Sequence, residues 1–193
     1  MPDTSTHHPV DQAMAAVSRA DFLPRGARAH AHVDAPILIG HGQTNSQPTT
    51  VRIMLKLLEV HPGQRVLDVG AGSGWTTALL ATLVGPGGQV IGVERHESLI
   101  AGANAALAPY SQSVAHIRLA TKGILGAPED APFDRILVSA EAERLPMELT
   151  DQLADGGVMV IPVRGTMLRV TREGDDAQVT RHGGFAFVPL IED

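Results

Sequence analysis

Residues 66–75, with the sequence VLDVGAGSGW, constrain the fold of this chain more than any other segment. The apolar run 66–69 predicts a buried strand, and glycine at every second position from 70 to 74 predicts a turn that Cβ atoms would obstruct. A helix over 75–84 then presents its free N–H groups to whatever lies against the turn. Such a strand, turn and helix are typical of a nucleotide-like ligand site at the carboxyl end of a parallel sheet.

Two details of this turn select among ligands. The spacing is G-x-G-x-G followed by Trp75, so the third glycine of the dinucleotide pattern is missing, and this counts against a nicotinamide oxidoreductase. Twenty residues after Gly74, the expected strand 90–93 ends in Glu94, an acid placed to accept hydrogen bonds from ribose hydroxyls. The combination resembles motif I of the class I S-adenosylmethionine methyltransferases. This resemblance implies a cofactor site that includes Gly70, Gly72, Gly74 and Glu94.

Strands and helices alternate along the chain, which predicts an α/β fold with a doubly wound, mainly parallel sheet. Residues 25–47 are expected to be irregular, and the tail 167–190 to form two or three antiparallel strands at the sheet edge. A short first helix is expected to end by Pro24 and Gly26, and Pro48 suits the first turn of another helix. The remaining strands are expected at 115–119, 135–138 and 158–163, and the remaining helices at 97–107 and 146–153.

Composition and charge exclude several classes of function. The net charge is −6 and no basic run interleaves with aromatic residues, so we expect no nucleic-acid partner. The chain has no cysteine, which excludes disulfides and thiolate metal sites and fits the cytoplasm. Its histidines lack metal-site spacing, so no metal is expected; His41 either lines a crevice or fills a loop. Neither a signal peptide nor an apolar span of about 20 residues is present, which predicts a cytoplasmic protein away from the membrane.

A second motif narrows the resemblance to one family. Residues 34–48 read DAPILIGHGQTNSQP, and this block resembles the signature that precedes motif I in protein-L-isoaspartate O-methyltransferases. The resemblance runs the whole length, through APFDRILVSA at 131–140, GGVMVIPV at 156–163 and FVPL at 187–190. It implies a single methyltransferase domain over 1–193. Within it, 1–64 would hold the N-terminal helices and the substrate crevice, 65–163 the cofactor-binding core, and 164–193 the C-terminal antiparallel strands.

The family resemblance implies a methyl transfer from S-adenosylmethionine, which becomes S-adenosylhomocysteine, to isoaspartyl residues of proteins or peptides. The acceptor is a free α-carboxylate with an ordinary pKa of about 3.5, so it is ionised at neutral pH and needs no general base. The protein must align carboxylate oxygen, methyl and sulfur, and exclude water. The methyl ester then cyclises to a succinimide away from the enzyme, and hydrolysis returns some normal aspartate, which implies protein repair.

The same resemblance assigns residues to the two sides of the reaction. Ser46 would lie beside the substrate carboxylate, although it also suits an N-terminal cap of the helix opened by Pro48. Asp68 either satisfies amides of the turn or binds the cofactor amino group through water, and the two readings stay open. Residues 187–190 would help to cover the site. The remaining assignments are Thr44 and Asn45 as catalytic residues beside Ser46, and Gln43 and Gly123 as cofactor contacts.

Two positions depart from the family pattern. The family carries an Asp that meets the adenine amino group where this chain has Lys122, and a lysine has only donors. We expect Lys122 to turn to solvent and the affinity for cofactor to fall moderately. Glu141 replaces a small residue, and we expect it to point outward. The alternatives left open are a methyltransferase for a dedicated peptide or small carboxylate, and a catalytically silent binding module. We expect a monomer, because scattered damage sites require an open crevice.

Overall fold

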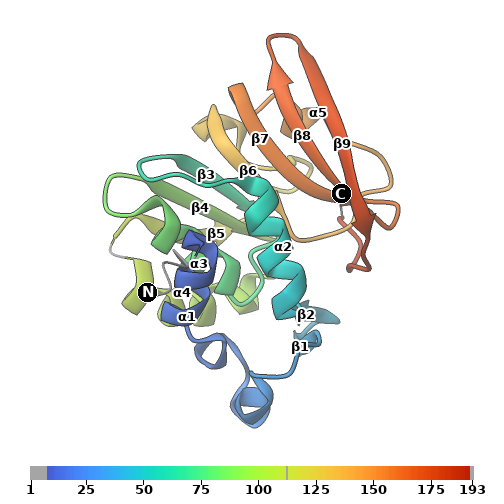
Figure 1. Cartoon of the computed structure of the whole chain (residues 1–193). Coiled ribbons are helices and arrows are strands. Elements are labelled where there is room, and N and C mark those ends of the chain that lie inside the picture. Colours follow the sequence, from blue (N-terminus) through green and yellow to red (C-terminus); the bar gives the residue numbers. More distant parts are fainter. Residues whose placement is uncertain (1–7, 112, 192–193) are drawn as a thin grey trace, which may run out of the picture.

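The computed structural model describes residues 8–111 and 113–191. Its centre is a seven-stranded sheet in the order β5-β4-β3-β6-β7-β8-β9 (Figure 1). The pairs from β5 to β7 are parallel, whereas β8 and β9 add antiparallel strands at one edge. The predicted fold class is therefore confirmed. The strands are β3 (Arg65–Val69), β4 (Gln89–Glu94), β5 (Ala115–Leu119), β6 (Phe133–Val138), β7 (Leu153–Val163), β8 (Thr166–Glu173) and β9 (Asp176–Gly184).

Four helices cover one face of this sheet. They are α1 (Pro9–Ala16), α2 (Pro48–Leu58), α3 (Trp75–Val84) and α4 (Glu97–Ser111). The opposite face is covered by the single-turn helix α5 (Met147–Thr150) and by Leu125, Ala127 and Ala131, which flank the mostly exposed 3-10 helix η3 (Pro128–Asp130). Because strand side chains alternate, Val66 packs under the helices and Leu67 packs on the opposite face. No helix in the described ranges is long and apolar enough to cross a bilayer.

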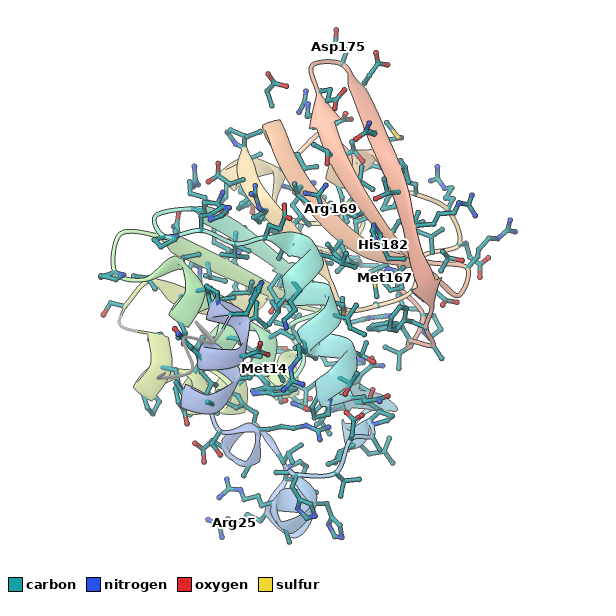
Figure 2. All side chains as sticks on the ribbon, in the orientation of Figure 1. Met14, Arg25, Met167, Arg169, Asp175 and His182 are labelled. Atoms are coloured by element: carbon teal, nitrogen blue, oxygen red, sulfur yellow. The ribbon has the colours of Figure 1, made fainter. Side chains whose placement is uncertain are left out.

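The strand order reverses at β3, and this places the carboxyl ends of β3, β4 and β6 around one crevice. The chain leaves β3 toward α3 and leaves β6 toward the segment that precedes α5. Strands β8 and β9 run on as a hairpin whose tip carries Asp175, away from the helices (Figure 2). The edge hairpin thus lies apart from the switch point, where a ligand site is expected.

The prediction that residues 25–47 are irregular is partly wrong. It contains the 3-10 helix η2 (Arg25–His30) and a two-stranded hairpin formed by β1 (Ile37–Gly40) and β2 (Gln43–Asn45). The first helix also ends earlier than predicted, at Ala16, and is followed by the 3-10 helix η1 (Arg19–Phe22). Elements this short carry no detectable periodicity, because tertiary contacts rather than local preference hold them in place.

In the second half of the chain one prediction needs correction, and of the two or three tail strands expected the structure has two, β8 and β9. The helix expected over 146–153 is reduced to α5, and β7 already begins at Leu153 and runs through Gly156 and Gly157. The last apolar segment does not form a third tail strand. Instead Glu141 pairs with it through one bridge to Pro189, and its backbone bonds Val188 and Leu190. This pairing draws the end of the chain back over the carboxyl end of β6.

Candidate active site

A cavity of about 440 Å³ lies at the carboxyl ends of β3, β4 and β5. The hairpin strand β2 closes one side of it, and the segment 188–191 closes another. Residues far apart in the sequence therefore meet in one crevice, as a switch point in a parallel sheet requires. The lining comes from 43–46, 69–73, Trp75, Thr76, 93–95, 119–126, Ser139, Ala140 and 188–191.

Most of the residues predicted from the sequence line this cavity. Two do not, because Asp68 is fully buried beneath it and Gly74 lies behind the turn. A Cβ on Gly74 would come within 2.9 Å of the Ile117 side chain, so this glycine serves the close packing of α3 on β5. The predicted residues that do line the cavity are Gln43, Thr44, Asn45, Ser46, Gly70, Gly72, Glu94 and Gly123.

Glu94 holds the glycine turn in place. Its Oε2 accepts the N–H of Gly72 at 2.8 Å, and its Oε1 accepts the N–H of His96 at 2.8 Å. The residue is only 4% exposed, yet each carboxylate oxygen keeps a further lone pair for a ligand. Gly72 adopts φ +55°, a conformation that strains other residues, and a Cβ there would lie 3.2 Å from Cδ1 of Ile39. The two carboxylate oxygens of Glu94 are therefore held in fixed positions on the cavity wall, where both can accept hydrogen bonds.

Asp68 faces α3 rather than the turn. Its Oδ2 accepts the hydroxyl groups of Thr76 at 2.8 Å and Thr77 at 2.7 Å, whereas its Oδ1 has no partner within the described residues. Burial raises the pKa of Asp68 to about 6; the two threonine hydrogen bonds lower it, and the nearby charge of Glu94 raises it. Of the two readings left open, direct satisfaction of turn amides is not what the structure shows.

This raised pKa predicts how stability of the ligand-free protein depends on pH. The folded state binds a proton at Asp68 more tightly than the unfolded state, whose pKa is 3.8, so the free energy of unfolding falls as pH rises from about 4 through 6. The loss amounts to about 3 kcal/mol at most. We expect Asp68→Asn to raise the melting temperature at pH 7.5 and to flatten its dependence over pH 4.5–7.5. A variant that melts lower than the wild type at pH 7.5 would contradict this account.

One wall of the cavity contains residues with hydroxyl groups. Ser46 and Thr44 both line it, and neither hydroxyl has a hydrogen-bond partner among the residues at 8–111 and 113–191. The capping role considered for Ser46 is wrong, since α2 begins after Gln47 without a side-chain cap. Asp34 takes that role instead, because its Oδ1 accepts the N–H of Thr49 at 2.8 Å. The Ser46 hydroxyl is thus available to a ligand.

Asn45 and Gln43 contribute differently. The side chain of Asn45 is buried, donates from Nδ2 to the Ser73 hydroxyl at 3.2 Å, and accepts from Arg19 at 2.7 Å. Gln43 donates from Nε2 to the carbonyl of His41 at 3.3 Å. Asn45 therefore joins the hairpin to the glycine turn, which makes it a positioning residue more than a contact for a ligand.

Trp75 forms part of the cavity wall, and Arg19 packs against it in a way that the sequence did not reveal. Trp75 lines the cavity from the start of α3, is 4% exposed, and its Nε1 has no partner in the described part of the chain. The guanidinium carbon of Arg19 lies 5.5 Å from the centroid of its ring. No motif marks Arg19, a lone basic residue in a 3-10 turn, and only its burial in the fold identifies it.

The two departures from the family pattern lie in different surroundings. Lys122 lines the cavity, is exposed, and has no hydrogen bond or ion pair with the described residues. Glu141 does not line the cavity. Contrary to the expected outward orientation, its Oε2 accepts the N–H of Gly165 at 3.0 Å, which ties the β7–β8 turn to the segment after β6. Its charge therefore does not face a bound ligand.

The histidines form no metal site in the described ranges, which contain no group of three or more potential ligands. His7 lies outside the described residues. His41 does not line the cavity; it stacks on His96 with ring centroids 4.7 Å apart, and its Nε2 lies 2.7 Å from the Ser98 hydroxyl. This contact attaches the tip of the β1–β2 hairpin to the loop that follows Glu94.

The comparisons with known proteins all find the same family. The sequence profile of the family described as Protein-L-isoaspartate(D-aspartate) O-methyltransferase (PCMT) matches residues 3–193. Proteins named protein-L-isoaspartate O-methyltransferase from Methanopyrus kandleri and Methylorubrum populi are each 45% identical, over 189 and 184 residues. The first alignment covers 94% of this chain and 83% of the relative, and the second covers 93% and 84%.

A solved structure adds a ligand to this comparison. It is a crystal structure of a beta-aspartate methyltransferase (PCMT) from Plasmodium falciparum in complex with S-adenosyl-L-homocysteine. The two chains are 26% identical, with a TM-score of 0.83, over 97% of this chain and 92% of that one. The likeness thus extends over the whole fold, including the N-terminal segment that carries Ser46.

Proposed function

The chain belongs to the protein-L-isoaspartate O-methyltransferase family, and from that premise we propose how its residues divide the work of the family's reaction. The reaction transfers a methyl group from S-adenosylmethionine to the free α-carboxylate of an L-isoaspartyl residue in a protein or peptide. The observation that carries the proposal is one cavity with two unlike walls. Thr44 of β2 and Ser46, which follows β2, line one wall, and the glycine turn with Glu94 lines the other.

The residues present fit S-adenosylmethionine. Buried Oδ1 of Asp68 and Nε1 of Trp75, beside the cavity, have no partner among the described residues, as expected where a polar ligand or its water completes the hydrogen bonds. Glu94 would accept the ribose hydroxyls, and Gly70 and Gly72 let the backbone approach the ligand closely. Gln43 and Gly123 would complete the contacts from two further sides. When bound, the cofactor supplies a methyl group on a positively charged sulfur.

The chain's own groups then have to orient the acceptor. A carboxylate at neutral pH is already a nucleophile, so a general base has nothing to remove. The Ser46 hydroxyl donates to one carboxylate oxygen and leaves the other free to attack, without the strong ion pairing that a cation would impose. Thr44 in β2 supplies a second hydroxyl two residues before Ser46, and Asn45 fixes β2 against Ser73. Alignment and exclusion of water supply the rate enhancement.

Lys122 sets the affinity for cofactor in this account. A lysine has no acceptor for the adenine amino group, so replacing it with a carboxylate adds one hydrogen bond worth about 0.5–1.5 kcal/mol. We expect Lys122→Asp to bind S-adenosylhomocysteine about threefold to tenfold more tightly in a calorimetric titration. Lys122→Ala serves as the control for removal of the charge alone. Equal affinities of the Asp and Ala variants would mean that the adenine is bound by other groups.

The wider setting of the activity follows from the same features. We propose that the whole chain is a single methyltransferase domain that works as a monomer in the cytoplasm, on damaged proteins and peptides and without nucleic acid. Support comes from the net charge of −6 and from the cavity, which is lined by residues of this one chain. Sedimentation at low micromolar concentration checks the oligomeric state, and a stable dimer would overturn that part of the proposal.

The direct test is transfer of a labelled methyl group from S-adenosylmethionine to an isoaspartyl peptide and to its normal aspartyl twin. We expect label on the isoaspartyl peptide alone, released as methanol by mild base, as an ester requires. No label, together with calorimetric binding of S-adenosylhomocysteine, would point to another carboxylate acceptor. No binding at all would indicate a silent module.

A further inference from the structure

Arg19 is the most heavily bonded side chain near the cavity, although it does not line it. The residue is 6% exposed, and its guanidinium makes six hydrogen bonds of 2.7–3.3 Å. All six acceptors are uncharged oxygens, five of the backbone and one of a side chain. They are the carbonyl oxygens of Ala31, Val33, Ala35, Asn45 and Ser46 and the Oδ1 of Asn45.

This contact set requires an arginine. Five N–H donors in a planar fork reach six acceptors when one donor is shared, whereas a lysine has three donors on a single nitrogen. Burial lowers the pKa of Arg19 and the charge of Asp34 raises it again, so the cation is held by carbonyl dipoles and by the face of Trp75. A lysine here could bond at most three of these six acceptors.

The bonds of Arg19 converge on the residues that face the substrate. Its Nη2 lies 3.0 Å from the carbonyl oxygen of Ser46 and 3.2 Å from that of Asn45. Its Nε orients the Asn45 amide, which in turn donates to Ser73 in the glycine turn. The same guanidinium therefore ties segment 31–35, strand β2 and the turn beside the cofactor into one rigid unit.

We propose that Arg19 is a positioning residue for methyl transfer, which fixes the backbone at Asn45 and Ser46 and so aims the Ser46 hydroxyl at the acceptor carboxylate. This inference rests on the proposed function of the cavity. Because Arg19 does not line the cavity, its influence passes through the hairpin and not through contact with either ligand. It predicts a defect in turnover with little change in cofactor binding.

The first test compares Arg19→Lys with a matched control. Arg169 in β8 is also partly buried and donates to a backbone carbonyl, that of Leu57 at 2.9 Å, but lies outside the cavity lining (Figure 2). We expect both Lys variants to melt at lower temperature than the wild type. Only Arg19→Lys should lose tenfold or more in kcat for an isoaspartyl peptide, with the Kd for S-adenosylhomocysteine within threefold of the wild type.

A double-mutant cycle with Ser46→Ala identifies the route of the effect. If Arg19 acts by aiming the Ser46 hydroxyl, the Lys substitution should cost less than threefold in kcat once that hydroxyl is absent. Equal losses in both backgrounds would overturn the proposal. An equal loss of kcat and of S-adenosylhomocysteine affinity would do the same, since it would indicate general disruption of the cavity.

A measurement without turnover separates this inference from the proposed function. Hydrogen exchange of the amides in 31–46 should accelerate at least tenfold in Arg19→Lys and stay unchanged in Arg169→Lys. If the wild type fails to methylate isoaspartyl peptides, the proposed function fails and the Arg19 assignment falls with it. If the wild type is active but exchange in this segment is unchanged, only the role of Arg19 is contradicted.

Discussion

Ser46→Ala should lower kcat/KM for an isoaspartyl peptide about 100-fold while the Kd for S-adenosylhomocysteine stays within threefold. A loss of this size, about 2.7 kcal/mol, is typical of removing one hydrogen-bond donor that is preorganised for the transition state. The reason lies in the structure: the Ser46 hydroxyl lines the cavity and is not engaged by any other described residue, and β2 is bonded to Arg19 and Ser73.

Steady-state kinetics with calorimetry measure both quantities for this variant. Ser98→Ala is the matched control, because Ser98 also presents a hydroxyl near the hairpin, but that hydroxyl contacts His41 outside the cavity lining. Unchanged kcat/KM in Ser46→Ala would remove the residue from the mechanism. Equal losses of turnover and of cofactor affinity would make it a cofactor contact instead.

Glu94→Ala should weaken binding of S-adenosylhomocysteine at least 100-fold. Two charge-assisted hydrogen bonds to the ribose hydroxyls are lost, each worth about 1.5–3 kcal/mol. The N–H groups of Gly72 and His96 also lose their acceptors, so the glycine turn loses its brace. The effect on binding should therefore exceed that of Lys122→Ala.

Calorimetric titration measures this loss directly. Glu97→Ala is the control, since it removes an exposed acid three residues further along, in the first turn of α4. Affinity within threefold of the wild type in Glu94→Ala would mean that the cofactor ribose does not lie against β4. That result would contradict the proposed cofactor site, and it would not bear on the role of Ser46.

The arrangement of the glycine turn and Glu94 was predictable from sequence because its signals are local. An apolar strand, a glycine turn and an acid at the end of the next strand each leave a pattern within a few residues, and the structure brings Gly72 and Glu94 to 2.8 Å of each other. The parallel sheet followed from the alternation of strands and helices. The antiparallel edge followed from the absence of helices after residue 167.

The signature at 34–48 marked Thr44, Asn45 and Ser46 for the substrate side, but the hairpin that carries the first two and the contacts that hold it leave no local pattern. The β1–β2 hairpin has strands of four and three residues, too short for a periodic signal, and it is held by Arg19 from a different part of the chain. The direction of the Asp68 side chain, toward the helices, does follow from strand alternation, because Val66 and Asp68 point to the same side of the sheet. Its unpartnered oxygen, in contrast, required the packed structure.

Conversion of an isoaspartyl peptide to its normal aspartyl isomer tests the central claim most directly. The two isomers have the same mass and are separated by chromatography, and the reaction is followed with wild-type protein, with Ser46→Ala, and without S-adenosylmethionine. We expect aspartyl peptide to accumulate only with the wild type and cofactor together. Cofactor consumed with no aspartyl peptide formed, or the same yield from Ser46→Ala, would contradict the account.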